Sequence, residues 1–241
     1  MANGPGKPFG GTPADGGEPS TDLDADRFLG VPLFPLPNVV LFPRAVLPLH
    51  IFEERYKVMT ADALSGDRLI AMALLRPGWE KNYYGKAAIE PVVCLGQILT
   101  HEQLDDGKYN FLLQGICRAT VTREQAGKPY RVVDLQRIAE APAIEMSLDD
   151  QRQRLTDLLQ ADVAAFLPGA QQFLQMLSSP LPTAAIADLI AFHLLDDVPL
   201  KQSILAEADV RKRVVQTAAA LAGLHPPPVA KVRFTSGPSW N

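Results

Sequence analysis

The sequence predicts an α+β protein in which a mostly antiparallel, barrel-like β domain is followed by an α-helical bundle. The first observation is that residues 29–140 contain about six or seven short apolar runs joined by brief turns, with helical spacing in one segment only. The second is that apolar residues recur with the 3.6-residue period of a helix from residue 141 onward. The change of period therefore marks a boundary between two architectures.

Composition extends this division to the two ends of the chain. Residues 1–28 are rich in Gly, Pro and Asp and have no basic segment followed by an apolar one. We therefore expect a disordered leader rather than a secretory signal. The β domain is assigned to residues 29–140 and the helical bundle to residues 141–225. Residues 226–241 form a Pro-rich tail with no core of its own.

The stretch from Val31 to Phe52 is apolar enough to resemble a membrane span, yet it contains five prolines. Proline inside a helix removes a hydrogen bond and clashes with the preceding turn, at a cost of about 3 kcal/mol each. The stretch is therefore predicted to form buried short strands, ended by prolines, at Val31–Phe34, Val39–Phe42 and Ala45–Phe52. Without a signal or a spanning helix, the chain is expected to be cytoplasmic and to have no membrane partner.

The one helix of the β domain is predicted directly after this stretch. Phe52, Tyr56, Met59 and Ala63 lie on one helical face, and Gly66 supplies a stop signal. The remaining strands are expected at Arg68–Leu75, at Pro91–Gln103, after the turn Asp106-Gly107 with a kink at Gly115, and at Pro129–Ile138.

Four or five helical segments are expected after residue 141. Ser147 followed by Asp150 resembles a capping box, and Thr183 is expected to cap a later helix. His193 lies on the apolar face of that later helix, so it is expected in the core, and Gly223 closes the last helix. Two apolar faces are predicted, one with Leu155, Leu158, Leu159, Val163 and Phe166 and one with Ile186, Leu189, Ile190 and Leu194.

Sequence motifs for catalysis or cofactor binding are absent. The chain has no P-loop, no G-x-G-x-x-G and no G-x-S-x-G, so no catalytic residue and no cofactor are predicted. Cys94 and Cys117 form no CxxC pair and are expected to be buried free thiols. His50 with Glu53 and Glu54 is the best metal candidate, but a zinc helix needs a second His that is absent, so no metal site is predicted.

The charge distribution argues against a nucleic-acid surface. The formal net charge is −4, and residues 29–140 carry 13 bases against 12 acids. The helical segment, residues 141–225, is acidic, with six bases against ten acids. Affinity for phosphates needs clustered Lys and Arg, and no segment of the chain provides such a cluster.

One loop gathers aromatic residues among charged ones. It runs from Arg76 to Lys86 and contains Trp79, Tyr83 and Tyr84. Two interpretations stay open. The rings could cap the barrel, or they could form a protein-contact surface, because Trp and Tyr are enriched at binding hot spots.

Several strings resemble a known family, the Lon protease N-terminal domain. The opening signature of that family is similar to "PLFPLPNVVLFPRAVLPLHIFEERY", and its second block is similar to "LGQILTHEQLDDGKYNFLLQGICRATV". Two further strings resemble the following strand and helical block, "PYRVVDL" and "IADLIAFHLLDDVPLKQSILAEADVRKRV". The resemblance spans roughly residues 30–222 and implies a PUA-like β pseudobarrel followed by a helical bundle.

The resemblance also implies roles for individual residues. Those that match the signature are expected to be structural: Pro35, His50, Glu53, Arg55, Tyr56, Gly107, Gly115 and Arg118. The 241-residue sequence departs from Lon because the Walker motifs of its ATPase and the Ser-Lys dyad of its peptidase have no counterpart. It therefore looks like a stand-alone, bacterial relative of the substrate-recognition domain.

Three functions are weighed on this basis. The favoured one is a non-enzymatic module that binds unfolded or partner polypeptides, with Trp79, Tyr83 and Tyr84 as candidate contacts. The first alternative is RNA binding, because PUA-like folds often bind RNA, although the charge distribution opposes it. The second is a hydrolase with an unrecognised site. A homodimer is left open.

Overall fold

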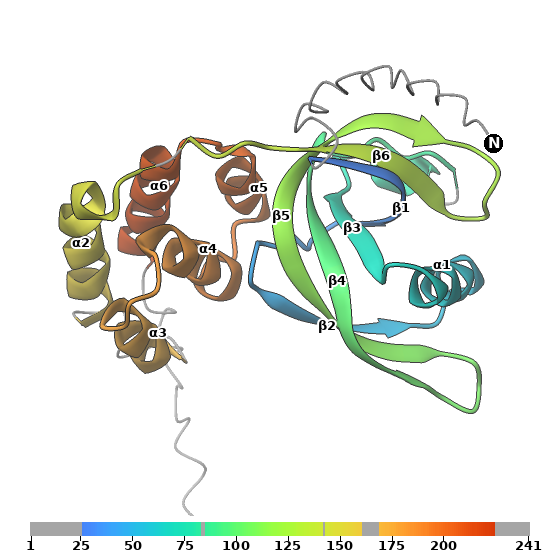
Figure 1. Cartoon of the computed structure of the whole chain (residues 1–241), viewed down its shortest axis with the longest axis horizontal. Helices are drawn as coiled ribbons and strands as arrows, with labels where there is room; N and C mark the ends of the chain where they lie inside the picture. Colours follow the sequence, from blue (N-terminus) through green and yellow to red (C-terminus); the bar gives the residue numbers. More distant parts are fainter. Residues whose placement is uncertain (1–25, 83–84, 142, 161–168, 225–241) are drawn as a thin grey trace, which may run out of the picture.

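A computed structural model describes residues 26–82, 85–141, 143–160 and 169–224 of the chain. The described residues form two halves that lie side by side (Figure 1). The β part contains six strands and helix α1, and the bundle contains helices α2 to α6. This arrangement confirms the predicted α+β class and the order of its two architectures. The expected tail lies outside the described residues, and so does the expected leader apart from residues 26–28.

The six strands form one sheet that closes on itself. Its order is β2-β5-β4-β3-β1-β6, and a further pairing between β5 and β6 completes the closure. The β1–β3 pair is parallel and all other pairs are antiparallel. The strands are β1 (Arg27–Leu36), β2 (Val46–Ile51), β3 (Leu69–Leu74), β4 (Val92–Gln103), β5 (Tyr109–Gln125) and β6 (Arg131–Arg137).

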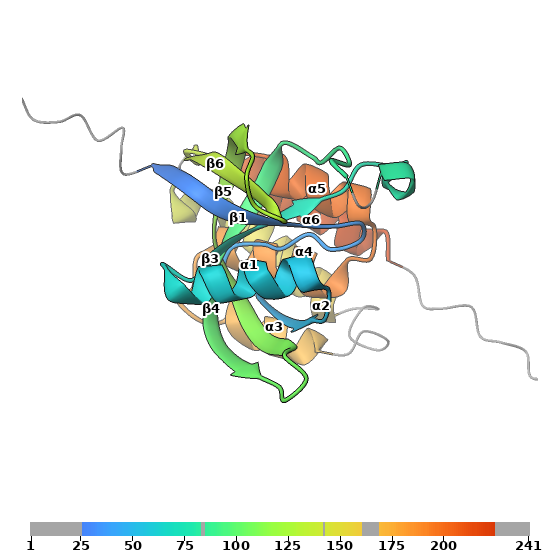
Figure 2. The ribbon, with the colours of Figure 1, turned by 90° about the vertical axis from the view of Figure 1, so that its right-hand side faces the viewer.

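Helix α1 (Glu54–Ser65) connects β2 to β3 and ends at Gly66, as the sequence predicts. Figure 2 shows it in front of the strands, on the side of the β part that faces away from the bundle. Tyr56, Met59 and Ala63 are buried on its inner face. Phe52, the first member of the predicted stripe, precedes the helix and is exposed.

Strand β1 differs from the prediction, because it continues through two prolines instead of ending at them. Pro32 pairs with Val132 of β6, and Pro35 pairs with Ala73 of β3. The β6 pairing ends at Leu33, where the β3 pairing begins, so each proline has a paired strand on one side only. A proline is tolerated at such a position because its missing N–H can face the unpaired side.

The strand predicted at Val39–Phe42 is wrong. These residues have no strand pairing, although Val40, Leu41 and Phe42 are buried in the core. A continuous apolar run predicts that its residues are buried, but it does not by itself predict that they form a strand. The segment instead carries the chain past β5, where Arg44 N–H donates to the Gly115 carbonyl at 2.7 Å.

Gly115 is required by this crossing. A Cβ added there would lie 2.0 Å from the Phe42 carbonyl oxygen and 2.7 Å from its carbonyl carbon. The register between β4 and β5 also shifts beside it, between Leu95 and Gly96. The position expected to be a kink is therefore a close approach of two backbones. Gly107 has φ +78°, which suits the turn predicted between β4 and β5.

The bundle consists of α2 (Asp149–Gln160), α3 (Ala170–Leu177), α4 (Thr183–Leu194), α5 (Val198–Ala206) and α6 (Val210–Ala222), preceded by the short helix η2 (Glu145–Leu148). Leu155 and Leu159 of α2 and Ile186, Ile190 and Leu194 of α4 are buried as predicted, and Gly223 ends α6. Val163 and Phe166 lie outside the described residues.

Three predictions for the bundle need correction. Ser147 caps nothing, because it lies within η2 and its hydroxyl donates to the Ile144 carbonyl. Thr183 is the first residue of α4 rather than its cap, and its N–H donates to Glu145 at 2.9 Å. His193 is exposed and packs edge-on against the Phe192 ring, so it is not a core residue. Helical periodicity places a residue near an apolar face but does not reveal where that face stops being covered.

The described residues form three clusters of buried apolar side chains, and one of them joins the two halves. One is built by strands alone and includes Leu33, Leu95 and Leu135. A second joins the other strand side chains to α1 and reaches the bundle through Ile204 and Leu205 of α5. The third lies inside the bundle. Cys94 and Cys117 are buried and free, as predicted.

A buried group of charges, the junction cluster, connects the β part to the bundle. It contains Arg118 of β5, Asp188 of α4, Arg213 of α6 and Glu140 of the linker after β6. Arg118 donates to Asp188 at 2.6 Å, to Glu140 at 2.9 Å and to the Leu205 carbonyl at 3.0 Å. Arg213 lies 3.1 Å from Asp188 and 3.2 Å from Glu140. Burial alone would lower the pKa of Arg118, but the charges of Asp188 and Glu140 outweigh burial and raise it.

We predict that Asp188→Asn destabilises the chain by about 3–5 kcal/mol, because two buried guanidinium groups then share only Glu140. Urea unfolding measures the loss. Glu90→Gln is the matched control, since its partner Arg76 is half exposed and such pairs contribute about 1 kcal/mol or less. Equal losses in both variants would contradict the role assigned to the junction cluster.

We predict that Gly115→Ala destabilises the chain by about 3 kcal/mol or prevents folding, because the new Cβ meets backbone atoms of Phe42 that cannot move aside. Gly66→Ala is the control, since its Cβ would meet nothing closer than 3.8 Å. Thermal unfolding of both variants checks this, and a Gly115→Ala protein as stable as Gly66→Ala contradicts it.

Candidate functional site

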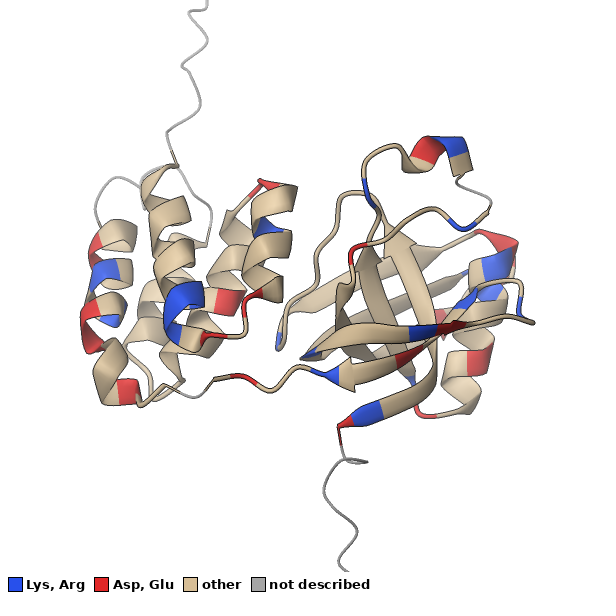
Figure 3. Ribbon diagram, turned by 90° about the horizontal axis from the view of Figure 1, so that it is seen from above, with Lys and Arg blue, Asp and Glu red and all other residues tan. Residues whose placement is uncertain are grey.

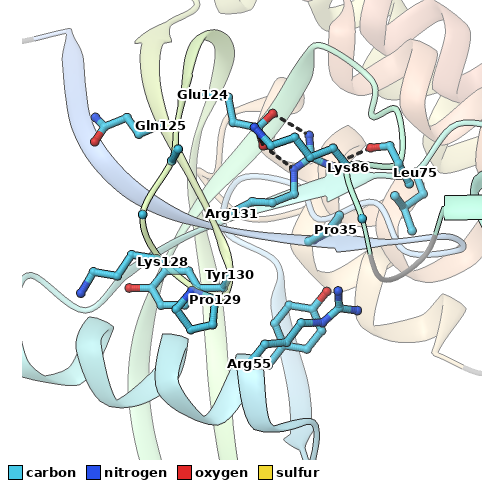
Figure 4. Close-up of a pocket in the computed structure, with 15 residues that line it drawn as sticks. Pro35, Arg55, Leu75, Lys86, Glu124, Gln125, Lys128, Pro129, Tyr130 and Arg131 are labelled. Carbon is cyan, nitrogen blue, oxygen red and sulfur yellow. Dashed lines mark hydrogen bonds and ion pairs between the residues drawn. The ribbon is translucent and has the colours of Figure 1, made fainter.

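The candidate site is a cleft of about 260 Å³ on the β part. Four pieces of chain surround it (Figure 4): the end of β1, the start of α1, the loop that follows helix η1 (Trp79–Asn82), and the hairpin between β5 and β6. These pieces are far apart in sequence and meet because the closed sheet brings β1 beside β6.

The floor of the cleft is apolar. Its buried residues are Pro35, Tyr56, Leu75, Ala87 and Tyr130. Tyr56 is held in place by Phe34, whose ring centroid lies 4.5 Å away at an interplanar angle of 54°. Aromatic pairs favour this tilted arrangement, so the floor is fixed before anything binds.

A fork of hydrogen bonds fixes the upper wall. Arg131 donates from Nε and from a terminal nitrogen to the two oxygens of Glu124, both at 3.0 Å, and donates to the Ala87 carbonyl at 2.7 Å. Burial works to raise the pKa of Glu124, but the hydrogen bonds and charge of Arg131, with Lys86 beside it, hold that pKa below its usual value. The β5–β6 hairpin is therefore tied at the cleft to the end of the loop that runs from Arg76 to Lys86, which we call the aromatic loop.

A second set of contacts ties the hairpin to α1. The Tyr130 hydroxyl donates to Asp62 at 2.6 Å, and the Lys128 ammonium lies 3.0 Å from the same oxygen. The bond from Tyr130, and then the bond from Lys128, lower the pKa of the Asp62 carboxyl. Burial and the neighbouring Asp62 raise the pKa of Tyr130. The carboxylate form of Asp62 is thus the one that this wall stabilises.

The remaining edge is cationic. The Arg55 guanidinium stands over the Tyr56 ring, 4.5 Å from its centroid, and Glu53 accepts a hydrogen bond from Arg55 at 3.1 Å. Lys86 and Lys128 are exposed at the rim. A cleft of this size with an apolar floor can take one or two side chains of a polypeptide. Among the described residues, no group of His, Cys, Asp and Glu could hold a metal ion.

The structure brings together three of the residues named from the sequence. Pro35, Arg55 and Tyr56 line the cleft, and Glu53 contacts it through Arg55. Trp79 is half-buried in η1, on the same loop as Ala87 but not in the lining. Tyr83 and Tyr84 lie outside the described residues.

The other signature residues lie elsewhere. The exposed side chain of His50 on β2 lies 2.7 Å from Asn110. Gly107 is in the β4–β5 turn, while Gly115 and Arg118 serve the crossing and the junction cluster. Sequence reasoning missed Glu124, Tyr130 and Arg131. The signal that could have indicated them is an acid and a base on adjacent strands, Glu124 and Arg131, which flank the turn at Gly127.

Comparison with known proteins gives a consistent match over most of the chain. The family described as "ATP-dependent protease La (LON) substrate-binding domain" matches residues 30–222. A Lon protease of Desulfosudis oleivorans is 26% identical over 196 residues, which are 76% of this chain and 22% of that protein. A Lon protease of Geobacter metallireducens is 27% identical over 192 residues, with the same two shares. The chain thus spans about a fifth of the length of these relatives.

Solved structures match over the same region. The N-terminal domain of Mycobacterium avium complex Lon protease superposes with a TM-score of 0.63 at 15% identity. A Lon N-terminal domain protein from Xanthomonas campestris superposes with a TM-score of 0.58 at 21% identity. Each comparison covers 80% of this chain and 98% of the other, which establishes the shared fold. Among the described residues, no helix is both long and apolar enough to cross a membrane.

We predict that Tyr130→Phe raises the pKa of Asp62 toward 3.8, because the variant loses the strongest hydrogen bond to the carboxylate. A lowered folded-state pKa adds stability above the unfolded-state pKa, and this stability is lost as pH falls through the folded value. Because the Asp62 side chain is partly exposed, solvent screening reduces the effect, and Tyr130→Phe should be less stable at pH 7 by about 0.5 kcal/mol, a difference that should shrink below pH 3.8.

A carboxyl ¹³C NMR titration gives the Asp62 midpoint, and urea unfolding at pH 7 and pH 3 gives the stability difference. Tyr109→Phe is the control, because the Tyr109 hydroxyl makes no hydrogen bond to any other described residue. An unchanged Asp62 midpoint in Tyr130→Phe would rule out this account of the wall.

Proposed function

Because the chain belongs to the family of Lon substrate-binding domains, we propose that it is a recognition module that binds unfolded or partner polypeptides in the β-part cleft. The family match over residues 30–222 is the observation that carries the proposal. It supports substrate recognition as the general role. The choice of the cleft rests on its buried apolar floor and on its position beside the aromatic loop.

The chemistry of the cleft suits the binding of a client side chain better than the catalysis of a reaction. Its floor presents ring and aliphatic surface, which gains free energy by removing an apolar client side chain from water. Its ionisable groups are engaged in pairs such as Arg131 with Glu124 and Lys128 with Asp62. We therefore propose a non-enzymatic role, in the cytoplasm of a bacterium, without an ATPase or peptidase activity of its own.

The aromatic loop is proposed as the rim of this site. Arg131 fixes the loop at Ala87, and Gly85 and Lys86 just before it line the cleft. Trp79 is half-buried there, and Tyr83 and Tyr84 adjoin it in the sequence. We propose that these rings add contact area to an extended client segment whose anchor side chain enters the cleft.

We predict that Ala126→Trp weakens binding of fluorescein-labelled β-casein about tenfold, because an indole on the exposed hairpin competes for the cleft. Fluorescence anisotropy measures the Kd. Unfolding free energy should change by less than about 1 kcal/mol, since Ala126 is a surface position.

Ala219→Trp, at an exposed position of α6, is the matched control and should bind casein as the unaltered chain does. Trp79→Ala, measured in parallel, tests the rim. Casein binding that survives Ala126→Trp, or that falls equally in Ala219→Trp, contradicts the cleft as the site. Failure of the unaltered chain to bind casein contradicts the function itself.

A further inference from the structure

A second cavity lies between the two halves and is separate from the cleft. This junction groove has a volume of about 500 Å³. It is lined by Asp26 before β1, by Pro43 and Arg44 before β2, by residues of β5, of the end of β6 and of the linker after it, and by residues at and in helices α4 and α6. Figure 3 shows several Lys or Arg positions on the tips of the β part that face the bundle. None of its lining residues is shared with the cleft.

The deep wall of the groove is the junction cluster. Arg118, Asp188 and Arg213 are buried there, and each is engaged by the others or by Glu140. These groups hold one another, so they shape the groove and are not free to capture a ligand. The groups available to a ligand are at the rim.

Two exposed arginines form that rim. Arg44 and Arg137 line the groove, and within the described part of the chain neither side chain has a hydrogen bond or an ion pair. Their backbones are fixed: Arg44 N–H donates to the Gly115 carbonyl and Arg137 N–H donates to the backbone carbonyl of Asp26, both at 2.7 Å. Asp26 also lines the groove, so the two arginines leave its edge with one positive charge in excess. Arg44 and Arg137, held on a rigid frame, are the groups that favour a carboxylate there.

An apolar residue lies in the same groove. Ile116 is 45% exposed although it sits in β5, and the bundle side contributes the uncharged Pro182, Ala184 and Ala185. An exposed isoleucine on a strand between cations is matched by a ligand with an apolar side chain flanked by acids. A free inorganic anion would leave Ile116 uncovered.

We propose that the junction groove binds a short acidic polypeptide segment from a partner protein, with carboxylates on Arg44 and Arg137 and an apolar side chain on Ile116. This interaction is independent of client binding in the cleft. It gives the chain a second contact surface, so one partner and one client can be held at the same time.

The probe is a fluorescein-labelled peptide, Glu-Glu-Leu-Glu-Glu, titrated with the full chain in 50 mM NaCl and followed by anisotropy. Arg44→Gln with Arg137→Gln should weaken binding about tenfold, roughly threefold for each lost charge contact. Arg123→Gln with Arg154→Gln removes the same charge from exposed positions outside the groove and should leave the Kd unchanged. Replacing the peptide leucine by glutamine should weaken binding to the unaltered chain, because the leucine covers Ile116. In the Ile116→Thr variant the two peptides should bind with equal affinity.

Several results would overturn the proposal. They are an absence of binding, equal losses in the two arginine pairs, and equal affinity for a Lys-Lys-Leu-Lys-Lys peptide.

Tighter binding of a single-stranded RNA of equal charge through the same arginines would assign the groove to nucleic acid. Stronger peptide binding after Asp15, Glu18, Asp22 and Asp24 are changed to their amides would make the chain's own acidic N-terminal residues the occupant. Casein binding is unaffected by either arginine pair if the groove and the cleft act separately.

Discussion

The buried ion network of Arg118, Asp188, Arg213 and Glu140 is the constraint on which the arrangement of the two halves depends. A guanidinium group removed from water needs opposite charge and hydrogen-bond acceptors, and Arg118 finds them on α4, on the linker and on the α5 carbonyl of Leu205. The observed placement of the bundle satisfies all three contacts at once. The network therefore specifies one orientation, whereas the apolar contacts of Ile204 and Leu205 supply attraction with little direction.

Contacts that fix the backbone also position the cleft and the junction groove in the β part. The close approach at Gly115 lets the Phe42 segment cross β5, and this crossing positions Arg44 at the junction groove. On the other side of the sheet, Arg131 and Tyr130 fasten one hairpin to the aromatic loop and to α1. The cleft and the groove are thus preorganised by polar contacts that surround apolar surface, which reduces the entropy lost when a polypeptide binds.

Local patterns in the sequence predicted the elements well, and long-range contacts account for what they missed. The change from period 2 to period 3.6 marked the two halves, and the signature strings indicated the family. The strand predicted at Val39–Phe42 and the core position predicted for His193 are wrong, because periodicity reports apolarity and not what covers it. The Arg118–Asp188 pair spans 70 residues and the Tyr130–Asp62 pair spans 68, so no local pattern reveals either. The cleft follows from such pairs, which is why its hairpin wall was not foreseen.

We propose that a polypeptide client contacts Pro35, Tyr56 and Ala87 in the cleft while the two halves keep their relative positions. Amide NMR of the ¹⁵N-labelled chain during titration with unlabelled β-casein tests it most directly. We expect chemical-shift changes to concentrate at Gly85, Ala87 and Gly127 around the cleft, while the amide signals of Asp188 and Arg213 do not shift. Changes confined to α2 to α6, or spread over both halves as the junction moves, would contradict it.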